Sequence, residues 1–214
     1  MRASVLVLLL VAGAARADED DVGLRRMAFH ERAGQLVMSG SVTDVFDQET
    51  LARLSNGFVT TVVVRIYLYR VGQEDRALAF SLAERRIAYD VWDEVYVIRL
   101  RDGDGERSYR EPSRAEALRR ATELVYVPVS PLANVEIGPL YFAGVVVAVN
   151  PVSEEILAEV RRWLTRPQGG QLSGDASFFG SFVSVFVNPR VSDADRVLRF
   201  RTQPLYRVKR EPKK

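Results

Sequence analysis

The feature that most constrains the fold is a long run of β-branched and aromatic residues between positions 58 and 71. Its apolar residues occupy alternate positions, namely Val62, Val64, Ile66 and Leu68, and between them stand Thr61, Val63, Arg65, Tyr67 and Tyr69. Successive side chains of a strand point to opposite faces, so this period of two predicts a β-strand. Only the first set is plainly core, and we therefore expect an antiparallel sheet with one buried and one hydrated side.

Comparable patterns predict further strands along the chain. The expected strands cover residues 35–46, 77–92, 94–101, 138–150, 178–187 and 197–208. Residues 102–105, Asp-Gly-Asp-Gly, predict a hairpin, because Asp-Gly supplies the positive φ that tight turns require. The run Val145 to Val149 consists of four Val and one Ala and is apolar throughout, which predicts burial on both faces.

Two segments in the first two thirds of the chain predict helices. Asp47 is a candidate N-cap for a short helix that carries Leu51 and Leu54 and ends near Asn56 and Gly57. Ser113 and Glu116 have the spacing of a capping box. The helix after them would present one apolar side and end before Pro128 and Pro131; that side comprises Ala117, Leu118, Ala121, Leu124 and Val125.

A third helix is expected over residues 153–165. Its apolar residues recur at helical spacing, namely Ile156, Leu157, Val160, Trp163 and Leu164. In total the chain predicts about seven to nine strands, paired mostly with sequence neighbours. The expected fold class is α+β: a mainly antiparallel β-sandwich-like domain with two or three amphipathic helices. A transmembrane barrel is disfavoured, because segments such as 84–86 and 199–201 lack a continuous apolar outer face.

The N-terminus has the layout of a secretory signal peptide. Arg2 is followed by an apolar run, and Ala15-Arg16-Ala17 supplies small residues at alternate positions. The apolar stretch is shorter than the roughly 20 residues that a bilayer span requires. We therefore expect a cleaved leader over residues 1–17, a single β-rich domain over 18–208, and a disordered basic tail over 209–214. The expected location is outside the cytoplasm, in a bacterial periplasm.

Composition narrows the possible partners. The chain has 30 basic and 28 acidic residues, and loss of Arg2 and Arg16 with the leader would leave 28 of each. Such a balance gives no overall attraction to nucleic acid. There is no cysteine, so thiol catalysis and disulfides are excluded. His30 is the single histidine and is expected to be partly exposed in the first strand, and we predict no metal site and no cofactor.

The most distinctive candidate site is the segment 89–96, which combines three carboxylates with three aromatic rings. Its residues are Tyr89, Asp90, Trp92, Asp93, Glu94 and Tyr96. Aromatic rings stack on sugars and a carboxylate pair can act as acid and base, so a glycosidase-like site is one reading. Binding of carbohydrate or peptide is a second. A structural role, with the rings anchored in the core and Asp93-Glu94 turning the chain, is the one that we favour.

Two weaker candidates have ordinary structural explanations. Asp102, Asp104 and Glu106 could offer oxygens to calcium, but the other ligands of a calcium loop are missing, which favours an acidic hairpin turn. The apolar segment 178–187 favours a buried strand. Its alternative is an interaction edge or a lipid contact through Phe182 and Phe186, assisted by the basic tail.

Four pieces of sequence resemble a known family. They are the segment around Trp92, the run Gly138-Pro139-Leu140-Tyr141, the segment from Asn150 to Trp163, and the ending 200–207, Phe-Arg-Thr-Gln-Pro-Leu-Tyr-Arg. Together they are similar to an uncharacterised family of exported bacterial proteins, a domain of unknown function. The resemblance implies a signal peptide and an envelope setting, and it transfers no active site.

From these observations we expect a non-enzymatic periplasmic or envelope domain that binds or scaffolds another envelope component, either a protein or a glycan. The first alternative is a carbohydrate-active or other hydrolase centred on Asp90, Asp93 and Glu94. Carboxylates that converge in a cleft beside Trp92 would favour the hydrolase, whereas scattered or solvated carboxylates would favour the binding domain. The second alternative is a peripheral membrane protein.

Overall fold

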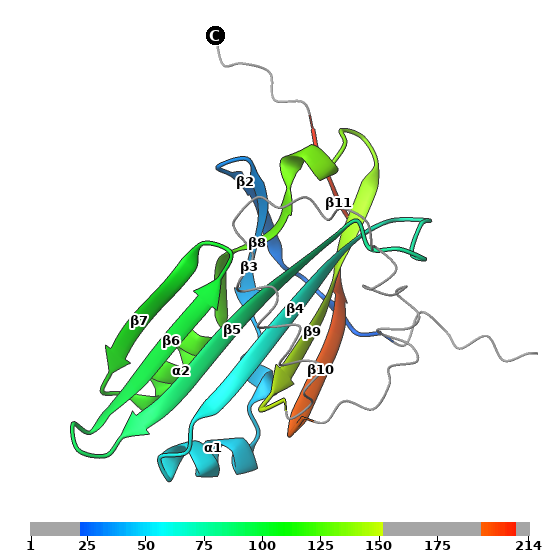
Figure 1. The fold of residues 1–214 in the computed structure, drawn as a ribbon. Coiled ribbons are helices and arrows are strands. Elements are labelled where there is room, and N and C mark those ends of the chain that lie inside the picture. The colour runs from blue at the N-terminus through cyan, green and yellow to red at the C-terminus, as the bar shows by residue number, and fades with distance from the viewer. Residues whose placement is uncertain (1–21, 152–193, 209–214) are drawn as a thin grey trace, which may run out of the picture.

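The computed structural model describes residues 22–151 and 194–208 (Figure 1). The expected leader, the helix over 153–165, the strand over 178–187 and the basic tail therefore lie outside the described residues. The main sheet has the spatial order β1 (Leu24–Arg25), β10 (Arg196–Thr202), β9 (Leu140–Val149), β4 (Thr60–Arg70), β5 (Ala79–Asp90), β6 (Val95–Asp102) and β7 (Gly105–Glu111). β11 (Leu205–Tyr206) also pairs with β9, and β1–β10 is the parallel pair of this sheet.

A second, three-stranded antiparallel sheet lies behind the main sheet in Figure 1. It consists of β2 (Ala28–Arg32), β3 (Gln35–Ser41) and β8 (Glu123–Pro131). The described residues also form two α-helices and two short 3₁₀ turns: α1 (Gln48–Ser55), α2 (Arg114–Thr122), η2 (Thr43–Val45) and η3 (Leu132–Asn134). The predicted sandwich-like α+β architecture is thus confirmed.

One face of the main sheet, which we call the inner face, packs against the second sheet and the helices. Val62, Val64 and Ile66 of β4 share a cluster with Met38 of β3 and Leu124 of β8. Towards β6 the same face continues beneath the helices, where Leu54, Ile98, Ala117 and Ala121 are buried together. Burying so much apolar surface between the layers is the main source of stability.

The expectation of a hydrated second side is wrong. On the opposite face, which we call the outer face, Val63, Tyr67 and Tyr69 of β4 are only 1%, 4% and 0% exposed. Phe142 and Val146 of β9 lie beside them in the same cluster. Alternation does not reveal this burial, because large tyrosine rings bury readily and a central strand can be covered on both faces.

The first predicted helix is confirmed, including both of its ends. The Asp47 carboxylate accepts a hydrogen bond from the Thr50 amide at 2.9 Å, as an N-cap does. Asn56 is the C-cap, and Gly57 follows with a φ of 81°, a conformation that glycine adopts without strain. This helix therefore stops where its sequence indicates.

The second predicted helix is confirmed at its start and wrong at its end. Ser113 is the N-cap but makes no side-chain capping bond. The helix ends at Thr122, and the chain continues directly as β8, so that Leu124 and Pro128 belong to a strand. Pro128 is tolerated there because β8 is an edge strand of the second sheet.

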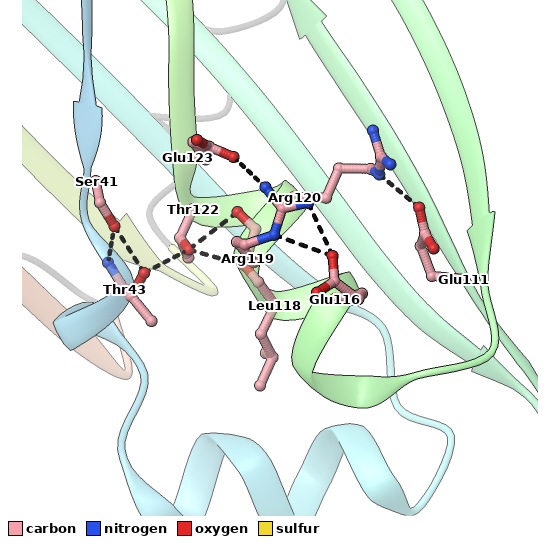
Figure 2. A network of polar contacts seen from close by, with 9 residues as sticks. All are labelled: Ser41, Thr43, Glu111, Glu116, Leu118, Arg119, Arg120, Thr122 and Glu123. Atoms are coloured by element: carbon pink, nitrogen blue, oxygen red, sulfur yellow. Dashed lines mark hydrogen bonds and ion pairs between the residues drawn. The ribbon is translucent and has the colours of Figure 1, made fainter.

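Polar contacts fix this helix-to-strand junction (Figure 2). The Thr122 hydroxyl lies 2.9 Å from the Thr43 hydroxyl and donates to the Leu118 carbonyl at 2.7 Å. Arg119 pairs with Glu116 in the helix and with Glu123 at the start of β8. The exposed ion pairs contribute little each, whereas the half-buried threonine contacts tie α2 to the loop after β3.

The inner-face core predicts a large difference between two identical substitutions. Ile66→Ala should lower the free energy of unfolding by about 2–5 kcal/mol, because it leaves a cavity between the sheets. Ile137→Ala removes the same atoms from an exposed position and should change it by less than about 0.5 kcal/mol. Urea denaturation of both variants measures the difference; equal losses would contradict the assignment of the core.

Candidate functional site

The segment 89–96 forms the end of β5, a tight turn and the start of β6. Tyr89 is paired with Tyr96 and Asp90 with Val95, which leaves residues 91–94 as the turn. Glu94 has a φ of 53°, a left-handed conformation that closes this turn. Asp90, Trp92 and Glu94 therefore do not share one face of a strand, because β5 ends at Asp90.

The aromatic residues of this segment lie in different surroundings. Tyr96 is buried in the core beneath α2, and the half-buried Tyr89 contacts it with ring centroids 4.8 Å apart. These two rings have the structural role that the sequence favoured. Trp92 does not, because it is 92% exposed at the end of the hairpin.

The carboxylates support the turn and a neighbouring strand. The Asp90 carboxylate accepts hydrogen bonds from the amides of Trp92 at 3.1 Å and Asp93 at 3.3 Å. Asp93 forms an ion pair with Arg110 of β7. Glu94 is exposed. Asp90 also lies 3.8 Å from the same Arg110 nitrogen, so Asp90 and Asp93 share one cation while they support the turn. Among the described residues no three His, Cys, Asp or Glu gather as a metal site would require.

Four exposed apolar residues meet at this end of the main sheet, and we call them the tip patch. They are Phe58, Val59, Val91 and Trp92; the first three are 57–60% exposed. The loop after α1 reaches the hairpin, since a β-carbon placed on Gly57 would lie 3.8 Å from Cγ1 of Val91. Single exposed apolar residues are common, whereas a group of them is a candidate interaction site.

A cavity of about 490 Å³ lies at the other end of the molecule, between the second sheet and the C-terminal strand. Apolar residues such as Phe29, Leu132 and Leu205 line it. Its charged residues already have partners: Arg207 pairs with Glu31 at 3.2 Å and donates to the carbonyls of Leu132 and Val135. His30 of β2 also borders this cavity and is exposed, as expected.

The acidic turn predicted at residues 102–105 joins β6 to β7, and it contains a buried charge that sequence analysis missed. The Asp102 carboxylate is buried, pairs with Arg107 at 2.6 Å and accepts from the Asp104 amide at 3.0 Å. Arg85 of β5 is also buried nearby, and desolvation lowers its pKa to about 10 while the Asp102 charge opposes this change. Position 85 could have been identified, because it alternates with the inward-facing Ala83 and Ile87.

Because Asp102 and Arg85 are both buried and oppositely charged, we expect their contributions to the free energy of unfolding to be coupled. Asp102→Asn should lower the free energy of unfolding by about 3–5 kcal/mol, because Arg85 then keeps a buried charge without its carboxylate. In an Arg85→Met background the same substitution should cost at least about 1 kcal/mol less. Urea denaturation of the double-mutant cycle tests this, with the exposed Asp104→Asn as control. Equal costs in both backgrounds would show that Asp102 acts only through Arg107.

None of the helices in the described residues is long and apolar enough to span a bilayer.

Comparisons with curated proteins and with solved structures gave no match. A family model, Domain of unknown function (DUF4390), matches residues 19–150, from before β1 to the end of β9. The matched range includes the Trp92 hairpin and most of the two-sheet core. By this match over more than half of its length, the chain belongs to the family described as a domain of unknown function, DUF4390.

Proposed function

We propose that this protein is a non-enzymatic, exported envelope domain that binds a partner protein through the tip patch. The observation that carries the proposal is the position of Trp92, almost fully exposed beside Val91 and the loop of Phe58 and Val59. Tryptophan is among the residues that most often dominate binding energy at protein interfaces. A protruding apolar turn fits a groove on a partner better than it encloses a small ligand.

The charges beside the tip patch indicate the character of the partner surface. Asp90, Asp93 and Glu94 stand in the hairpin against one nearby cation, Arg110. The excess of carboxylates favours an apolar groove bordered by Lys or Arg, because complementary charge speeds association and excludes wrong partners. The same excess opposes insertion of this hairpin into an anionic membrane surface.

The arrangement of the carboxylates also supports binding over hydrolysis. The two carboxyl groups of a glycosidase flank the scissile bond and stand about 5–10 Å apart in an open cleft. In the hairpin, by contrast, Asp90 closes the turn and Asp93 pairs with Arg110. Carboxylates that are occupied by the turn and by Arg110, with Glu94 exposed to solvent, support a binding domain.

A photocrosslinking amino acid in place of Trp92 tests the proposal in cells. We expect one reproducible crosslinked protein, and we expect Phe58→Ser to abolish that crosslink because it removes a neighbouring part of the tip patch. Tyr206→Ser alters an exposed aromatic residue at the opposite end and should leave it intact. Crosslinking to lipid or glycan alone, or a crosslink that persists in Phe58→Ser, would refute a protein partner at this patch.

Export makes a separate prediction. Cell fractionation followed by N-terminal sequencing should find the mature chain outside the cytoplasm, beginning at Asp18. Ala17→Arg should block cleavage, because signal peptidases require a small residue there, and the longer chain should remain with the membrane fraction. Lys213→Arg is a matched control at the far end of the chain. An intact N-terminus in the cytoplasm of wild-type cells would refute export.

A further inference from the structure

The outer face of the main sheet is a second apolar surface, distinct from the tip patch. Its central residues are Val63, Tyr67, Tyr69, Leu82, Phe142 and Val146, which are all 0–7% exposed. Tyr69 and Phe142 stack with ring centroids 5.5 Å apart, and Tyr67 contacts Phe80 at 5.1 Å. An aromatic surface of this kind requires a covering layer, because leaving it in water forfeits the hydrophobic free energy.

The described helices and the second sheet do not supply that layer. In the part of the chain that the structure describes, they pack on the inner face: α2 and the second sheet lie behind the main sheet in Figure 1, and α1 lies at its lower end, with Leu54 in the inner-face core. The residues that alternate with the outer-face residues contact the second sheet. For example, the Ser81 hydroxyl of β5 donates to the Pro128 carbonyl of β8 at 2.6 Å. On the outer side the described chain adds only marginal residues such as Val22 and Ala77.

Besides Arg86, Arg99 and Arg101 on β5 and β6, three arginines lie on the outer face along β4 and β10. Arg199 of β10 and Arg65 of β4 are both in register with Val146 of β9, and Arg201 is in register with Gly144. Half-burial lowers the pKa of Arg199, and the charge of Arg65 lowers it further. A covering layer that suits this face therefore combines apolar side chains for the aromatic rings with carboxylates near Arg199.

We propose that segment 152–193 of this chain docks on the outer face as its covering layer. The segment leaves the end of β9 and returns at the start of β10, and these ends are adjacent because Val149 is paired with Arg196. A helix over residues 153–165 would be about 20 Å long, and β4 is about 35 Å long, so 42 residues can run along the sheet and back.

The sequence of the segment has the required chemistry. The predicted helix carries an apolar stripe that includes Ile156, Val160 and Trp163. Glu155 and Glu159 are four residues apart and border this stripe on the Trp163 side, so a helix that lays the stripe on the sheet also brings carboxylates towards it. A second copy of the chain is a less direct source of this layer, because segment 152–193 is already attached to the sheet at the adjacent ends of β9 and β10.

The two tryptophans of the chain allow a direct test in the full-length protein. Trp92→Phe leaves Trp163 as the only tryptophan, and Trp163→Phe leaves the exposed Trp92. We expect Trp163 to emit at shorter wavelength than Trp92 and to be quenched by acrylamide several-fold less, with both differences lost in denaturant. Equal emission and equal quenching in folded protein, checked by circular dichroism, would overturn the proposal.

A second pair of variants locates the contact. In the Trp92→Phe background, Tyr67→Ser should shift the Trp163 emission to longer wavelength and raise its quenching, because Tyr67 lies on the outer face. Tyr126→Ser removes an exposed ring from β8 and should change neither. An unchanged Trp163 spectrum in folded Tyr67→Ser would overturn docking at this face. A short-wavelength emission that appears only with dimerisation in sedimentation would assign the layer to a second copy instead.

Discussion

The fold depends on the antiparallel pairing of β4 with β9. These strands are separated by about 70 residues of sequence, yet they pair without interruption from Val62–Val149 to Arg70–Tyr141. β5, β6 and β7 extend the sheet from β4, and β10, β11 and β1 extend it from β9. Because both strands are central and apolar on both faces, their pairing supplies the inner core, the outer face and the order of all other strands in the main sheet.

The inner face buries two charged residues among its mostly aliphatic side chains. Most of it is aliphatic, but towards the β6–β7 turn it contains Arg85 and Asp102, both buried. A buried charge is tolerated only where an opposite charge and hydrogen bonds compensate for lost hydration, and Asp102 obtains both from Arg107 and the Asp104 amide. The turn is therefore stabilised from the core side, while its other acidic residues remain at the surface.

Local sequence patterns predicted the features that depend on local physics. Alternation identified β4, the Asp-Gly pair identified the β6–β7 turn, and Asp47 with Gly57 identified both ends of α1. The failures arose where tertiary context decides. The burial of Tyr67 and Tyr69 depends on what lies above the sheet, and the exposure of Trp92 depends on where the hairpin turns. Likewise, α2 gives way to β8 because residues 123–131 find a partner in β3.

The pairing of β4 with β9 also sets a distance. The tip patch lies where β4 begins, and the strand ends about 35 Å away, next to the cavity and the last described residues of the chain. A sheet braced by a second layer bends little over that length. If a partner binds the tip patch as proposed, it would consequently be held at a nearly constant spacing from the C-terminal region.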